Sequence, residues 1–116
     1  MTRRTPPENL RDFPCSICAV ACAIGHLPMG ISDYLAQLKS DGYATLNVAN
    51  RFIRTHLDIK KRTNYKRGQR PKLKDLHLDG KAVVCVYGHL VYVDHEDYWS
   101  FFENENDYVV AVWEIK

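Results

Sequence analysis

The C-terminal part of the chain, from Ala82 onward, is a series of short runs rich in β-branched and aromatic residues. The runs are AVVCVY, HLVYV, YWSFF and YVVAVWEI, and polar breaks of turn length separate them. Such runs are typical of β-strands joined by tight turns. They predict an antiparallel sheet over residues 82–116, and this sheet limits the fold more than any other feature.

Three segments with the apolar spacing of helices precede the sheet, within residues 15–57. The first runs from Cys15 to about Gly25, the second covers about 32–41, and the third covers about 45–57. In each segment apolar residues recur at intervals of three and four, as on one face of a helix. Helices followed by strands are typical of the α+β class, here with N-terminal helices packed on a C-terminal antiparallel sheet.

A chain of 116 residues is long enough for a single domain with one core. We expect residues 1–14, which contain three prolines, to form an extended arm, and residues 60–74 to form a basic loop. The basic loop has 8 of the 16 Lys and Arg residues and no acid, whereas residues 94–107 have 6 acids and no Lys or Arg. The sequence therefore predicts one strongly positive region and one negative region.

Neither a signal peptide nor a membrane-spanning segment is visible in the sequence. The first ten residues are charged but have no apolar run behind them, and no uncharged stretch is apolar enough to cross a bilayer. We therefore expect a cytoplasmic protein without membrane contact. In that compartment the four cysteines are expected to be reduced thiols.

Cys15 is the first candidate for chemistry, because Pro14 places it at the start of the first helix. Backbone N–H groups and the positive end of the helix dipole favour a thiolate there. A nucleophilic cysteine also needs a base, and a histidine on a separate element is the usual one. Of the five histidines, His89 opens a strand directly after Gly88, where the missing side chain lets another element approach closely. The other four lie in or beside helices or in an acidic turn.

The order of these features resembles the papain-like cysteine peptidases. The matching segments are CSICAVACAIG at 15–25, GHLVYV at 88–93 and YVVAVW at 108–113. The likeness is strongest to short forms of the family, namely peptidases that process bacteriocin leaders and compact phage-encoded relatives. It implies a papain-like fold and a hydrolase that cleaves amide, peptide or isopeptide bonds of a protein or peptide substrate, without a cofactor. If the chain is phage-encoded, its compartment is the host cytoplasm.

The resemblance also implies roles for four residues. Cys15 corresponds to the nucleophile and His89 to the base. Asn9 stands where the family has a Gln whose side-chain amide helps to hold the oxyanion. Ser100 stands where the short phage forms have an Asp that orients the imidazole. A hydroxyl can orient an imidazole, but it cannot stabilise an imidazolium as a charge does.

The position of Ser100 follows from strand pairing. A turn at 94–97 sets Val93 opposite Tyr98, and the alternation of side chains then puts Ser100 on the same face as His89. If Ser100 does not orient the imidazole, the next candidates are Asp97 and Asn104.

A metal site is one alternative. Cys15, Cys18, Cys22 and His26 are close in sequence and include types that bind zinc. Three of them stack at i, i+4 and i+8 on one helix, where the outer two are about 12 Å apart and cannot easily converge. We therefore expect no metal, and we expect Cys18, Cys22 and Cys85 to be small buried apolar residues.

The other alternative is a binding protein. A papain-like scaffold with weak catalysis, derived from a phage, would then bind or inhibit a host protein, or bind nucleic acid, through its charged faces. Residues 60–74 are the expected contact for an acidic protein or a nucleic acid. Tyr65 is the only aromatic residue among them, so the segment by itself has no set of rings for base stacking.

Overall fold

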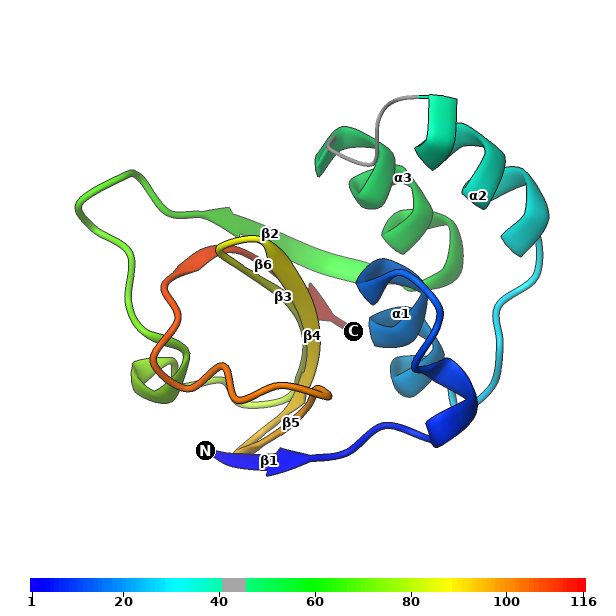
Figure 1. Cartoon of the computed structure of the whole chain (residues 1–116). Helices are drawn as coiled ribbons and strands as arrows, with labels where there is room; N and C mark the ends of the chain where they lie inside the picture. The colour runs from blue at the N-terminus through cyan, green and yellow to red at the C-terminus, as the bar shows by residue number, and fades with distance from the viewer. Residues whose placement is uncertain (41–45) are drawn as a thin grey trace.

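A computed structural model describes residues 1–40 and 46–116. In this part of the chain, three helices lie on one side of a six-stranded sheet, as Figure 1 shows. The helices are α1 (Cys15–Ile24), α2 (Ile31–Ser40) and α3 (Leu46–His56), with short 3-10 turns η1 (Glu8–Leu10) and η2 (Leu73–Asp75). The strands are β1 (Thr2–Arg4), β2 (Ile59–Asn64), β3 (Lys81–Val86), β4 (His89–Asp94), β5 (Asp97–Trp99) and β6 (Val109–Ile115). The predicted α+β class is confirmed.

Helix α1 begins and ends where its sequence predicts. Pro14 precedes it in an extended conformation, and the first helical hydrogen bond runs from the Cys18 N–H to the Pro14 carbonyl at 3.1 Å. At the other end Gly25 has a φ of 83°, and its N–H donates to the Ala21 carbonyl at 2.8 Å. A left-handed residue at this position ends a helix and favours glycine.

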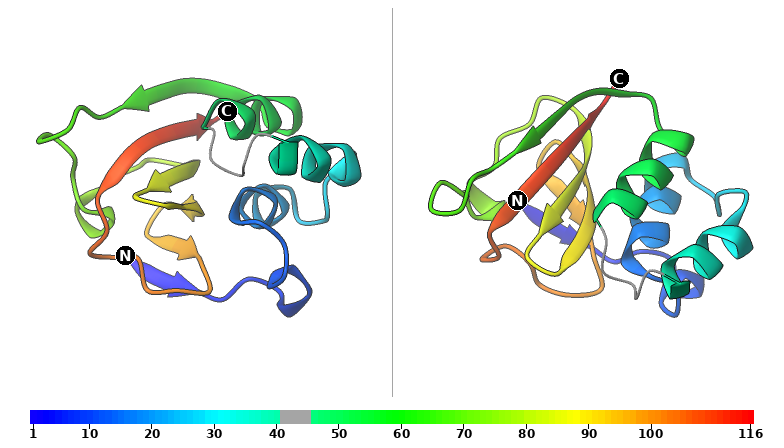
Figure 2. Two further views of the ribbon diagram at one scale, coloured as in Figure 1. Left: turned by 45° about the horizontal axis from the view of Figure 1, so that its top comes forward. Right: turned by 90° about the horizontal axis from the view of Figure 1, so that it is seen from above.

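Helices α2 and α3 also match the predicted segments, and both views in Figure 2 show them beside α1. The predicted boundaries at 41 and 45 lie outside the described residues. The apolar faces of these helices are buried at Leu38, Tyr34 and Phe52, and the rings of the last two are stacked with centroids 3.8 Å apart. Within the described residues, no helix is both long enough and apolar enough to cross a bilayer.

The sheet has the strand order β1-β5-β4-β3-β6-β2. Every pair from β2 to β6 is antiparallel, and Val93 pairs with Tyr98 as predicted. Strand β1, in contrast, runs parallel to β5. The strands within 82–116 are thus antiparallel as predicted, and β1, which lies outside the predicted sheet, makes the whole sheet mixed.

Both edge strands come from segments that the sequence predicted to be an extended arm and a loop. β1 lies in the expected arm, and β2 takes the first residues of the expected basic loop to pair with β6. Neither strand has an apolar alternation that a sequence pattern could detect. An edge strand needs only backbone pairing on one side, and exposed charged side chains such as Lys60 and Lys61 are common there.

Apolar side chains are buried on both faces of the sheet. The face that meets the helices includes Val83, Leu90, Tyr92 and Trp113, and the opposite face lies beneath Leu73 and Leu76 near η2. Trp113 is fully buried, and its indole N–H donates to the Asn50 side chain on α3 at 2.8 Å. Each large apolar side chain buried in this way contributes about 1.5–3 kcal/mol, so the helices are held firmly on the sheet.

Candidate active site

Cys15 is the first residue of α1, and its side chain is partly buried. The first backbone N–H groups of a helix have no partner within the helix. In α1 no side chain caps them either. The backbone N–H of Leu90, the residue after His89, lies near enough to the thiol to lower its pKa, although burial outweighs this effect. Cys15 therefore packs on the first residues of β4.

Cys15 and His89 line the same two neighbouring cavities. The larger, of about 470 Å³, extends toward Tyr34 and Leu38 on α2, and the smaller, of about 280 Å³, extends toward Phe102. Within the described residues, no hydrogen bond joins the Cys15 thiol to the His89 ring. The structure thus brings the predicted pair into one cleft without hydrogen-bond contact.

The hairpin between β3 and β4 positions His89. Val86 pairs with His89, so Tyr87 and Gly88 form a two-residue turn. Gly88 has a φ of 77°, which favours glycine in such turns. A Cβ on Gly88 would meet no atom within 4 Å. The expected reason for this glycine, the close approach of another element, is therefore wrong; its backbone conformation is the reason.

Ser100 lies directly after β5 and is only 2% exposed. Its Oγ is 3.3 Å from His89 Nε2, so the predicted proximity of these two side chains is confirmed. The ring of Phe102 contacts the His89 ring edge to face, with centroids 5.6 Å apart. Ser100 and Phe102 therefore contact the His89 imidazole on two sides.

The hydrogen bonds around Ser100 decide which nitrogen of His89 carries the proton. Ser100 Oγ donates its one proton to Asn104 Oδ1 at 2.6 Å and accepts the Phe102 N–H at 3.1 Å. The Asn104 amide is itself oriented, because its Nδ2 donates to Asp107 Oδ2 at 2.7 Å. Ser100 has no second proton, so His89 Nε2–H must be the donor. The neutral ring then has a free lone pair on Nδ1.

Asp107 is the functional candidate that sequence reasoning missed. Asn104, a secondary candidate, connects it to Ser100, whereas Asp97 forms an ion pair with Arg4 at 3.5 Å. Asp107 is one of 6 acids in the 94–107 segment, and nothing in the sequence distinguishes it from the others. Only the fold of the loop between β5 and β6 brings its charge to the imidazole through two intervening side chains.

The pKa values of the pair shift in opposite directions. Burial lowers the pKa of His89, and the negative charge of Asp107 partly opposes this. Burial also raises the pKa of the Cys15 thiol, and the nearby backbone N–H of Leu90 partly opposes that. The direction for Cys15 is opposite to the one expected from the helix dipole. Both shifts favour an uncharged thiol beside an uncharged imidazole.

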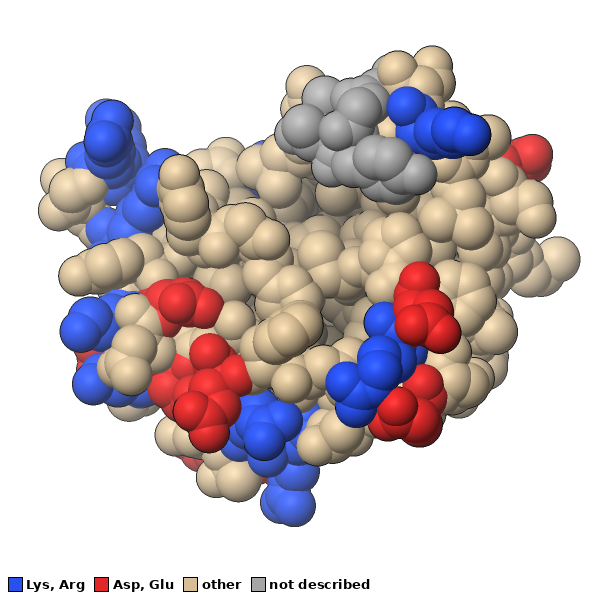
Figure 3. All heavy atoms as spheres, viewed as in Figure 1, with Lys and Arg blue, Asp and Glu red and all other residues tan. Residues whose placement is uncertain are grey.

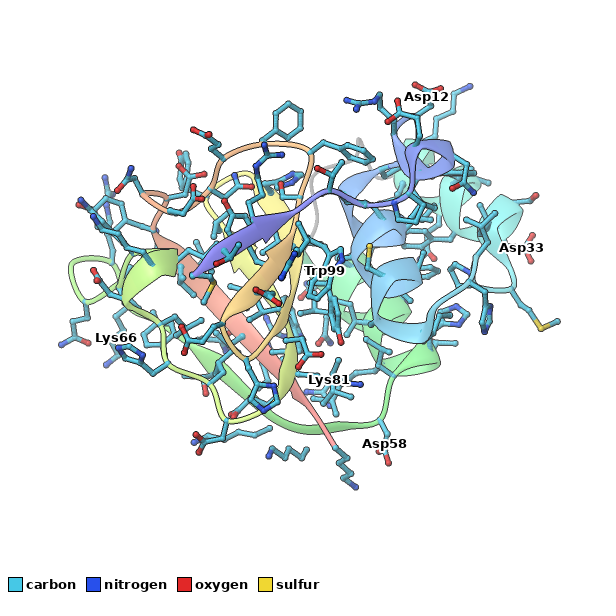
Figure 4. All side chains as sticks on the ribbon, turned by 90° about the horizontal axis from the view of Figure 1, so that it is seen from below. Asp12, Asp33, Asp58, Lys66, Lys81 and Trp99 are labelled. Carbon is cyan, nitrogen blue, oxygen red and sulfur yellow. The ribbon has the colours of Figure 1, made fainter. Side chains whose placement is uncertain are left out.

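Asn9 lies in η1 and is exposed. It lines a different cavity, of about 310 Å³, together with Cys22, His26 and Trp99. In Figure 4 Trp99 points from β5 toward α1. The structure therefore does not bring the Asn9 amide into the cavities that Cys15 lines.

All four cysteines are free thiols. The three besides Cys15 differ in burial. Cys18 is buried as predicted, whereas Cys22 and Cys85 are only partly buried. Cys85 lines the larger cavity with Cys15, and burial raises its pKa to about 11. Within the described residues, no three His, Cys, Asp or Glu side chains come together in an arrangement that could hold a metal ion.

No protein-family model, no curated protein and no solved structure matches this chain.

Proposed function

We propose that the chain is a cysteine hydrolase with a papain-like fold, which cleaves an amide, peptide or isopeptide bond of a protein or peptide substrate. The main support is the hydrogen-bonded series from Asp107 through Asn104 and Ser100 to His89. This series leaves Nδ1 of His89 as a proton acceptor, in the cleft that Cys15 lines. The order of elements, with the nucleophile at a helix start and the base at a later strand start, supports the papain-like fold.

The proposed reaction has two steps. In acylation, the Cys15 sulfur attacks the carbonyl carbon while its proton moves to His89 Nδ1. The C–N bond then breaks, and His89 gives that proton to the leaving amine. In deacylation, His89 takes a proton from water, whose oxygen attacks the thioester; the carboxylic acid leaves, and the proton returns to the sulfur. The backbone N–H of Cys15, at the uncapped start of α1, would hold the oxyanion in both steps.

The pKa directions favour His89 as a general base over a preformed ion pair. A neutral imidazole can accept the thiol proton during the attack, and burial keeps the ring neutral by lowering its pKa. The charge of Asp107 then stabilises the imidazolium as it forms. Catalytic hydrogen bonds are often longer in free enzymes and tighten when substrate binds, so a Cys15–His89 bond is expected only in the complex.

The test is acylation by p-nitrophenyl acetate, followed by mass spectrometry of the protein quenched in acid. We expect a single acetyl group on Cys15 and slower acylation in His89→Ala, by about 100-fold or more. Asp107→Asn keeps an oxygen for the Asn104 amide but removes the charge. It should slow acylation about fivefold, the equivalent of about 1 kcal/mol. It should also shift the acidic limb of the pH–rate profile to lower pH, because Asp107 raises the pKa of His89.

The matched control is Cys85→Ser, since Cys85 lines the same cavity but has no role in the proposed reaction. This variant should acylate at the rate of the unchanged protein. Equal acetylation of Cys15 and Cys85, or a Cys15 rate that does not depend on His89, would exclude the proposed pair.

A further inference from the structure

A further cavity lies beside Tyr87, in the turn between β3 and β4. The cavity has a volume of about 330 Å³ and is lined by Arg67, Gly68, Arg70, Tyr87 and Tyr108. This volume is at the lower end of the range for small-ligand pockets, about 300–1,000 Å³. None of its lining residues lines the two cavities that Cys15 shares with His89.

Two exposed aromatic rings meet at this cavity from distant parts of the chain. Tyr87 is in the β3–β4 turn and is 80% exposed, and Tyr108 directly precedes β6 and is 53% exposed. A hydrogen bond of 3.0 Å from the Tyr87 N–H to the Tyr108 carbonyl holds the two backbones together. Tyrosines exposed to this degree gain little from the core, so their rings are available to a ligand.

Basic side chains surround the two rings. Lys72 pairs with Tyr108 in an isolated bridge, and its Nζ lies 6.0 Å from the ring centroid. Arg67 and Arg70 belong to the loop after β2, where Lys and Arg gather at the upper left of Figure 3. In Figure 4 Lys66 of this loop lies at the end of the molecule away from the helices.

These cations form no ion pairs with described acidic side chains. In the part of the chain that the structure describes, no ion pair includes Arg67, Arg70 or Lys72. The segment between β5 and β6 contains acids, and Asp107 directly precedes Tyr108, but its carboxylate accepts a hydrogen bond from the Asn104 side chain and not from any of these three cations. Three cations at or beside the cavity therefore have no ion-pair partner among the described residues, and their charges can attract an anion.

We propose that this cavity, with the basic loop around it, binds single-stranded nucleic acid. Stacking on aromatic rings and attraction of the phosphates to basic side chains are the two contacts that such ligands need. An acidic protein would use the charges but not the rings. A duplex hides its base faces, so it cannot stack on a tyrosine in a cavity. The proposal concerns a second site and does not depend on the proposed hydrolase.

The experiment is fluorescence anisotropy with labelled oligothymidylate and oligouridylate of about 12 nucleotides. Tyr87→Ala and Tyr108→Ala should each weaken binding about fivefold or more, and Tyr87→Phe, which retains the ring, should bind like the unchanged protein. Arg67→Gln with Arg70→Gln should reduce the slope of log Kd against log salt by about 0.7 for each phosphate that the variant no longer neutralises. Because Arg70 also donates to the Tyr65 carbonyl, Arg67→Gln alone serves if the double variant melts at a lower temperature.

Two control variants remove the same kinds of side chain, a cation and an aromatic ring, at positions outside the cavity. Lys39→Gln removes an exposed cation on α2, and Phe102→Ala removes an exposed ring that is 64% accessible. Neither should change oligonucleotide binding. The proposal is overturned if the Tyr→Ala variants bind as tightly as the unchanged protein. It is also overturned if a duplex or polyglutamate competes as well as the single strand, or if no oligonucleotide binds at low salt.

Discussion

At the scale of single residues, His89 makes stability depend on pH. Burial lowers its pKa below the ordinary value of 6.5, so the unfolded chain binds a proton more readily than the folded one. The stability from a neutral His89 is therefore complete above that ordinary value and is lost as the pH falls toward the lowered pKa.

We expect the melting temperature to fall between about pH 7 and about pH 5, and to fall less in His89→Gln, which cannot be protonated. This window avoids the two acids whose pKa values are lowered, Glu8 and Glu105, because their contributions change only near and below 4.5. Thermal denaturation at a series of pH values measures the difference. Parallel curves for the two proteins would mean that His89 is as easily protonated in the folded state as in the unfolded state.

At the scale of elements, the β3–β4 hairpin determines where the imidazole lies. Gly88 holds a φ of 77° without any atom near its missing side chain, so a substitution there meets backbone strain and no steric overlap. Gly88→Ala should lower the free energy of unfolding by about 1–2 kcal/mol and slow Cys15 acylation, because His89 follows directly.

The matched control for the hairpin is Gly80→Ala, just before β3. A Cβ at Gly80 also meets nothing within 4 Å, but this residue does not have a positive φ. Urea denaturation of both variants should show a loss for Gly88→Ala and no loss for Gly80→Ala. Equal losses would show that the strained turn is not what distinguishes the two positions.

At the scale of the whole molecule, the basic segment lies on an edge strand and a loop, so most of its charges contribute little to folding. Lys60, Lys61 and Lys66 are exposed, and reversing all three to Glu should change the free energy of unfolding by less than about 0.5 kcal/mol per site. Arg62 differs, because its guanidinium lies 4.9 Å from the ring centroid of Trp113.

Arg62→Ala should therefore destabilise the protein by about 0.5–1 kcal/mol, because the cation–π interaction with Trp113 is removed. Chemical denaturation of the triple reversal and of Arg62→Ala separates the two classes of basic residue. A large loss in the triple reversal would mean that the edge strand depends on its charges.

Local sequence was sufficient to predict helix α1, the tight turn before His89 and the proximity of Ser100 to His89. A helix start, a two-residue turn and the alternation of strand side chains depend on neighbours within a few positions, so their patterns are visible in the chain. The edge strands were not predictable in this way. β1 and β2 are polar, and backbone pairing with a strand far along the chain is what orders them.

The surroundings of the cleft were decided only by the tertiary structure. The link from Asp107 to His89 passes through Asn104 and Ser100, and it exists because the loop after β5 folds back on itself. The rise in the pKa of Cys15 has the same origin, since burial against β4 depends on how the helices pack. Tyr87 and Tyr108 likewise join the basic loop only through strand pairing. Hydrogen bonding, desolvation and long-range pairing depend on residues that are distant in the chain, so no local pattern encodes them.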